Sequence, residues 1–175
     1  MTKQITIESV SVKHVHDENP DLSWLGEFIW KTPDKSDLNR GNIIPHETDR
    51  DGRCYFVPQI NVENHRADLV KMGYSRGTAE SMAREYVKQD YRRLRDYGDG
   101  WVSLGIIAEA VVSYPIGGGN RRLETLTSGG LWGVESDGGE YLEEIEKEQI
   151  NELKGHLEAF GVDISDFGEM EIQRA

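Results

Sequence analysis

The residues best suited to chemistry form a stripe of glutamates near the C-terminal end of the chain. They are Glu140, Glu143, Glu144, Glu148 and Glu152. On a helix, residues four apart share one face and lie about 6 Å apart along the axis. The stripe is interpreted in two ways: as a solvated helix face made of good helix formers, or as a polyanionic surface that binds a basic groove.

The charge density of this stretch is lower than that of duplex DNA. When Glu146 and Lys147 are also counted, the turns from 140 to 152 carry a net charge of −5. As a helix they span about 20 Å, which gives one charge per roughly 4 Å. DNA carries one charge per about 1.7 Å, so a mimic built here would be sparser than the polymer it replaces.

Two histidines near the N-terminus are the first candidates for metal binding. His14 and His16 lie two residues apart, so on a strand they share one side at a distance of about 7 Å, with Asp17 next to them. The sequence places no further ligand near them, and a metal site needs at least three. We therefore favour a solvated strand end and predict no metal and no cofactor.

A glycine-rich corner precedes the glutamate stripe. Its glycines are Gly129, Gly130 and Gly133, which surround Trp132 and permit positive φ or close backbone approach. Asp137 is predicted to cap the following helix, because a glutamate lies three residues later, as in a capping box. The corner thus turns the chain from a strand into a helix.

Ser128 is the one nucleophile that the corner offers. A nucleophile elbow needs glycines two residues before and two residues after the serine, but residue 126 is a leucine. No histidine is placed by the sequence to act as its base, so we predict no catalytic residue. An enzyme or ligand-binding protein that uses this corner and the aromatic cluster at 23–30 remains an alternative.

The stretch from Arg76 to Tyr97 combines six basic residues with four acidic ones. Together with Tyr86, Tyr91 and Tyr97, the arginines could form a surface for stacking and phosphate binding. Tyrosines at helical spacing more often belong to a core or its rim. We therefore favour ion pairs with nearby acids.

Length and composition predict a single domain over 1–175. A chain of 175 residues with 37% hydrophobic and 30% charged residues can bury a substantial core. No apolar run approaches the roughly 20 residues of a membrane span, so no membrane association is expected. The single cysteine, Cys54, is consistent with a reducing compartment and hence with a cytoplasmic location.

The net charge of −12 is concentrated near the C-terminus. Residues 135–175 hold 13 acidic residues against three basic ones. Because like charges repel, direct binding of nucleic acid through this part of the chain is not expected.

Periodicity predicts an α+β fold: a three- or four-stranded, largely antiparallel sheet packed with two main helices. A long loop at 31–54, led by the aromatic cluster, follows the first strand, and residues 162–175 form an acidic tail that packs as a strap or stays mobile. The predicted strands are 3–16 with a bulge near Ser9, 55–57, 101–116 and 121–126, the last two joined by a glycine hairpin. The predicted helices are 63–72, 76–97 and a last one that ends at Gly161.

Four segments carry a resemblance to known proteins. They are residues 23–28, 90–94, 100–110 and the corner motif at 126–137. Together they resemble small uncharacterised proteins encoded by bacteriophages, plasmids and related mobile elements. The resemblance is weakest over 31–61, and it implies an origin on a mobile element without assigning a role to any residue.

We therefore expect a non-enzymatic, phage-type protein that binds a host macromolecule in the host cytoplasm. The sharper form of this hypothesis is an acidic nucleic-acid mimic that inhibits a host defence or nucleic-acid-processing enzyme, with the five glutamates of the stripe contacting a basic groove of a host protein. A structural protein or a homo-oligomer is a further alternative.

Overall fold

The computed structural model of the chain describes residues 5–46, 52–165 and 167–174. They form two compact units: the first combines residues 1–20 with 101–175, and the second comprises residues 21–100. The predicted α+β class is confirmed, whereas the single domain over 1–175 stays a prediction.

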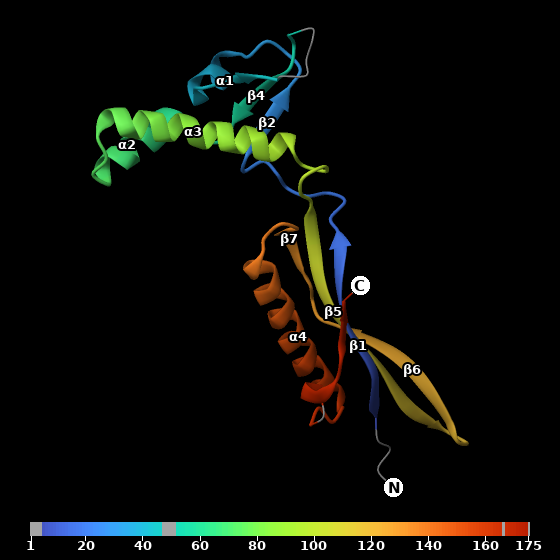
Figure 1. Cartoon of the computed structure of the whole chain (residues 1–175). Helices are drawn as coiled ribbons and strands as arrows, with labels where there is room; N and C mark the ends of the chain where they lie inside the picture. The colour runs from blue at the N-terminus through green and yellow to red at the C-terminus, as the bar shows by residue number, and fades with distance from the viewer. Residues whose placement is uncertain (1–4, 47–51, 166, 175) are drawn as a thin grey trace. The chain divides into compact units, whose positions relative to one another are not determined.

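The first unit is a five-stranded mixed sheet with one long helix along a face (Figure 1). Its strands are β1 (Thr6–His16), β5 (Ser103–Gly117), β6 (Asn120–Thr127), β7 (Leu131–Glu135) and β8 (Ile172–Arg174), and its helices are α4 (Glu140–Phe160) and the short 3-10 helix η1 (Phe167–Glu169). The strand order is β6-β5-β1-β8, and β7 also pairs with β5. The sheet therefore has more strands than predicted.

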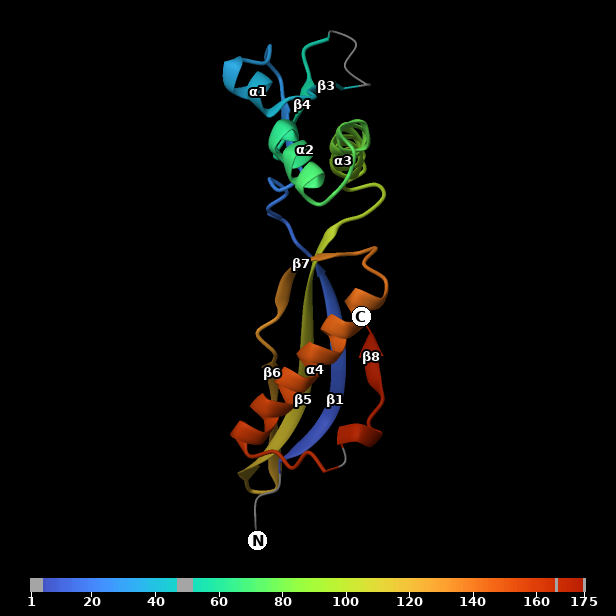
Figure 2. The ribbon, with the colours of Figure 1, turned by 90° about the vertical axis from the view of Figure 1, so that its left-hand side faces the viewer.

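β1 and β5 form the central pair of strands in this sheet. Their pairing is antiparallel, and its register shifts between Ile7 and Ser9, where the sequence predicts a bulge. The predicted glycine hairpin is also confirmed, because Gly117 pairs with Asn120 as β5 turns into β6. In contrast, β8 runs parallel to β1, beside which it lies at the edge of the sheet (Figure 2).

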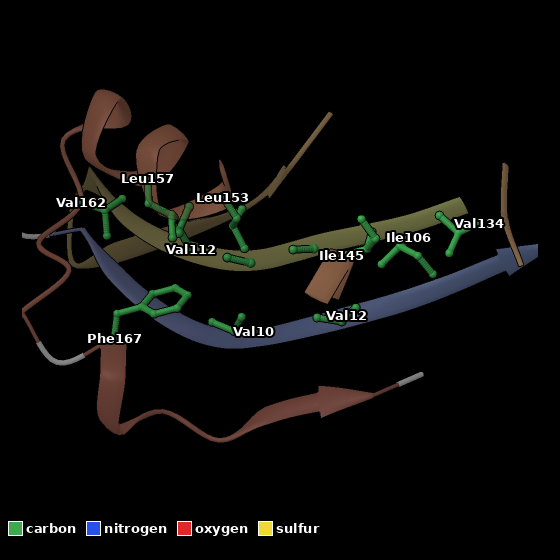
Figure 3. Packing of buried hydrophobic residues seen from close by; sticks show 12 residues of the cluster. Val10, Val12, Ile106, Val112, Val134, Ile145, Leu153, Leu157, Val162 and Phe167 are labelled. Atoms are coloured by element: carbon green, nitrogen blue, oxygen red, sulfur yellow. The ribbon is translucent and has the colours of Figure 1, made fainter. Parts of the chain in front are cut away.

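The core of the first unit lies between the sheet and α4 (Figure 3). Ile106 and Val112 are fully buried on β5, as expected for a strand with neighbours on both sides, but Val102 is only half-buried because it precedes the strand. Apolar residues on both faces of β5 predict cover on both faces. α4 covers one of them, whereas Ile107 and Val111 on the opposite face are half-buried.

The segment after α4 packs on the unit as a strap. Gly161 ends the helix in the left-handed conformation, as predicted. Val162 and Phe167 then insert into the core, and Ile172 packs against it from β8. The described residues of this segment thus pack as the predicted strap.

The second unit consists of a helical hairpin and a small antiparallel sheet of order β2-β4-β3. Its strands are β2 (Gly26–Ile29), β3 (Ile44–Pro45) and β4 (Tyr55–Pro58), and its helices are α1 (Lys35–Arg40), α2 (Val62–Lys71) and α3 (Arg76–Arg95). The core is built around Phe56 and Val87, both fully buried. α3 packs on the core of this unit.

The long loop predicted at 31–54 holds regular structure. The side chain of Asp34 caps α1 by accepting hydrogen bonds from the backbone N–H groups of Ser36 and Asp37. The carboxylate of Asp37 in turn accepts from the N–H of Asp34. β3 follows it within the same stretch, while residues 47–51 lie outside the described residues. Part of the aromatic cluster before α1 forms β2. Leu25, just before this strand, and Ile29 within it are buried, whereas Trp24 and Trp30 on either side are exposed.

Candidate interaction surface

α4 separates an apolar face from an acidic one. Ile145, Leu153 and Leu157 recur at helical spacing and are buried against the sheet (Figure 3). On the opposite side, all five glutamates of the predicted stripe are exposed. The helix therefore positions the stripe towards solvent, as the periodicity indicates.

Four of the five glutamates are uncommitted within the described residues. We call them the acidic face: Glu140, Glu143, Glu144 and Glu148. No hydrogen bond or ion pair links any of them to another described residue. Their carboxylates are thus available to an external partner.

Glu152 differs from the other members of the stripe. Its Oε1 accepts from the backbone N–H of Gly129 at 3.2 Å and lies 3.9 Å from Nε2 of His156. This carboxylate therefore helps to hold the corner on α4. It lies beyond the end of the acidic face and already has contacts within the chain.

Glu146 is buried, although the sequence groups it with the acidic turns. It is 5% exposed; its Oε1 lies 2.8 Å from Nε2 of His14, and its Oε2 accepts from Nε of Arg174 at 3.0 Å. The exposed charge of the turns from 140 to 152 is therefore −4 rather than −5. The contact with Glu146 also gives His14 a role within the fold, because its Nε2 lies against this buried carboxylate.

The predicted cap of α4 is wrong. Gly139, with φ of 56°, is the N-cap, and no side chain caps the helix. A turn closed by the N–H of Gly138 and the carbonyl of Glu135 delays the helix, so Glu140 is its first residue. Asp137 lies in this turn, two residues too early to cap.

The glycines of the corner serve close contacts or positive φ angles. The N–H of Gly130 donates to Oε1 of Gln149 on α4 at 3.0 Å, and Gly133 has a φ of 80° at the irregularity of β7. Trp132, half-exposed, lies over Gly105, where an added Cβ would be 2.5 Å from its ring. The corner thus joins β7, β5 and α4, and Gln149 is a partner that the sequence analysis missed.

Ser128 is used in the sheet. It is 5% exposed, and its Oγ accepts from the backbone N–H of Ala108 at 3.0 Å. Nearby, Nδ1 of His156 lies 2.8 Å from the carbonyl oxygen of Thr127. Both contacts tie the end of β6 to its neighbours, and neither forms a nucleophile–base pair.

The basic stretch on α3 is largely neutralised by its own acids. Arg84 pairs with Glu80 and Arg92 with Glu85, while Tyr91 is buried in the core. This arrangement confirms the interpretation as core and ion pairs.

Within residues 5–46, 52–165 and 167–174, no three potential metal ligands lie close enough together to hold a metal ion. This holds also for the neighbourhood of His14 and His16.

Tyr141 is a residue of this surface that the sequence analysis missed. It is 53% exposed at the start of α4, three residues before Glu144 and seven before Glu148. Residues three apart are neighbours on a helix surface, and residues seven apart share a face two turns along it. An exposed aromatic ring among carboxylates is a ready contact for an arginine or lysine.

Comparisons of the chain with protein families, with curated proteins and with solved structures found no match. None of the described helices is long and apolar enough to cross a bilayer.

Proposed function

We propose that the protein is a non-enzymatic binding protein whose acidic face docks on a basic, nucleic-acid-binding groove of a host protein. The observation that carries the proposal is the acidic face itself: four carboxylates on one helix face with no partner among the described residues. Glu146 and Glu152, on the same helix, are engaged within the chain.

The rigidity of α4 supports this proposal. Leu153 and Leu157 are fully buried, and Gln149 and Glu152 bind the corner, so the helix is fixed on its sheet. Carboxylates on a fixed helix lose little conformational freedom on binding. A groove lined with arginine and lysine would also take Tyr141 as an aromatic anchor.

The resemblance to proteins of mobile elements supplies the biological setting of the proposal. A phage-type protein that occupies the nucleic-acid groove of a defence or processing enzyme would inhibit that enzyme in the host cytoplasm. The balance of charge favours a protein partner over direct binding of nucleic acid through this face.

The proposal is tested by reversing two charges of the acidic face. Glu144→Lys and Glu148→Lys together change exposed residues, which rarely costs more than about 0.5 kcal/mol of folding free energy. We expect affinity for a partner recovered from host lysate to fall roughly tenfold or more, because the contact is mainly electrostatic. The measurement is a titration of both proteins at about 0.1 M and about 0.5 M salt.

The matched control is Glu18→Lys with Glu169→Lys, which changes the net charge equally at two exposed positions outside α4. This control should keep the affinity of the unchanged protein. Competing duplex DNA should displace the unchanged protein from its partner. Equal affinities for the two charge-reversed proteins, or resistance to DNA and to salt, would refute the proposal.

A further inference from the structure

The edge of β1 is only partly covered by β8. Within the described residues, three of the eleven residues of β1 pair with β8, through Val10–Ile172, Ser11–Gln173 and Val12–Arg174. The backbone groups of an edge strand are a ready template for another strand. Before Val10, residues 5–7 share a hollow with Asp163, Phe167 and Met170 of the strap, so the part of the edge that remains available to a longer segment is residues 13–16.

The slot that β8 fills has a defined chemistry. Ile172 pairs with Val10 on the face of the sheet that packs against the core, and Arg174 lies on the same face two residues later. Both Nε and Nη2 of Arg174 lie 3.0 Å from Oε2 of Glu146. The slot thus accepts an apolar side chain and, two residues on, a cation.

Glu146 is what makes the slot selective. Its side chain is 7% exposed, and a buried carboxylate needs a charged or hydrogen-bonding partner. His14 supplies one contact and Arg174 the other. A segment without a cation at this position would leave half of the buried carboxylate unpaired, which is costly.

β8 itself is attached by few contacts. It has three residues, and the side chain of Arg174 is 72% exposed despite its ion pair. Phe167 is 3% exposed and fixes the chain before it, so release of β8 leaves this anchor in place. Short, solvated strands of this kind open at lower free energy than the core.

We propose that the β1 edge is a docking site for an extended segment of a partner protein, with an apolar residue followed two positions later by arginine or lysine. In the free protein β8 occupies this site. A partner segment longer than β8 displaces it, because the segment pairs with more of β1 while reproducing the contact with Glu146. This strand-addition site is distinct from the acidic face of α4.

The test uses a fluorescent synthetic peptide with the sequence of residues 168–174 and full-length protein. Ile172→Asp removes the apolar contact of β8 and brings a second carboxylate close to the face that holds Glu146, so it should free the slot. We expect the peptide to bind this variant at least roughly tenfold more tightly than the unchanged protein, since the slot is no longer occupied. Arg174→Glu is a second variant that should free the slot by repulsion.

The matched control is Gln173→Asp, which introduces the same charge at an exposed neighbour and should bind the peptide as weakly as the unchanged protein. A peptide carrying Arg174→Glu should bind none of the proteins. Hydrogen exchange at those amides of residues 10–12 that face β8 rather than β5 reports whether the slot opens. The proposal is overturned if these amides stay protected in both variants, if the opened slot does not take the peptide, or if the peptide with the reversed charge binds equally well.

Discussion

Glu144 and Glu146 are two residues apart on α4, yet their surroundings are opposite. Glu144 is exposed without a described partner, and Glu146 is buried between His14 and Arg174. A rotation of about 200° separates them around the helix axis, which is enough to move a side chain from solvent to the sheet. The same residue type therefore serves as surface charge and as buried anchor.

Gly139, the N-cap of α4, and Gly155, within the helix, should respond oppositely to alanine. Gly139 has a φ of 56°, where a Cβ is strained, so Gly139→Ala should lower the free energy of unfolding by about 1–3 kcal/mol. Gly155 lies exposed in the middle of the helix with no atom within 4 Å of an added Cβ. Gly155→Ala should therefore raise stability by about 0.5–1 kcal/mol.

Urea denaturation of the two variants and the parent measures both effects. Gly155→Ala is the control, because it shows the effect of replacing a glycine where the backbone conformation suits alanine. If Gly139→Ala were as stable as the parent, the positive φ at the start of α4 would be incorrect.

Residue environments could be predicted where they depend on local spacing. The exposure of Glu144 follows from the apolar residues on the other side of the same helix. The burial of Glu146 depends on His14, which is 132 positions away in sequence, and on Arg174. The cap at Asp137 is predicted wrongly for a different reason: a local turn closed by Glu135 and Gly138 delays the helix, and the spacing of a capping box does not reveal it.

At the scale of elements, long periodic segments were predictable, whereas among the short strands β4 was predicted, as residues 55–57, and β2, β7 and β8 were not. α3, α4 and the β5–β6 hairpin carry their own repeating pattern and glycine stops. β2, β7 and β8 have three to five residues each, too few to establish a period. They are strands because a distant partner pairs with them, as Val10 does with Ile172.

The α2–α3 hairpin should show a dependence on pH through Asp90. Burial raises the pKa of Asp90 on α3, and the charge of His65 on α2 opposes this rise. The folded pKa therefore lies above the unfolded value of 3.8. The cost of burying the ionised form appears as the pH rises above 3.8 and is complete above the folded pKa. Asp90→Asn should raise the free energy of unfolding at neutral pH, and the gain should vanish below pH 3.8.

The matched control for this measurement is Asp68→Asn on α2. The neighbouring Lys71 lowers the pKa of Asp68, so its ionised form is favoured in the folded state. This variant should lose stability at neutral pH, and its loss should also fade as the pH falls. Urea denaturation at neutral and acid pH compares the two, and a change of equal sign in both variants would contradict the assignment.

For the whole molecule, the charge is divided unequally between the two units. The first unit contains 18 acidic and 7 basic residues, a net charge of −11, whereas the second contains 14 and 13, a net charge of −1. Long-range attraction to a basic partner therefore acts on the first unit, which also carries the acidic face. The uneven distribution of charge expected from the sequence thus follows the division of the chain into two units.

The two hydrophobic cores share no residue, which predicts separate responses to core mutations. Phe56→Ala should cost the second unit about 3–5 kcal/mol. Amides of the second unit should then exchange faster, while those of β1 and β5 keep their protection. Hydrogen exchange followed by mass spectrometry measures both units in one sample.

The matched variant is Ile106→Ala in the first core, which should cost about 2–5 kcal/mol and reverse the pattern. Equal loss of protection in both units for either variant would instead indicate one cooperative domain over 1–175.

The pairing of β1 with β5 joins residues as far apart as Thr6 and Ser113, with the whole second unit encoded between the two strands. At a synthesis rate of about 5–20 residues per second, β5 follows β1 from the ribosome by roughly 5–20 s. During this interval β1 has no partner strand, and its Val10 and Val12 remain without a core. The nascent chain thus presents an unpaired strand with an apolar face, which is the kind of segment that chaperones protect.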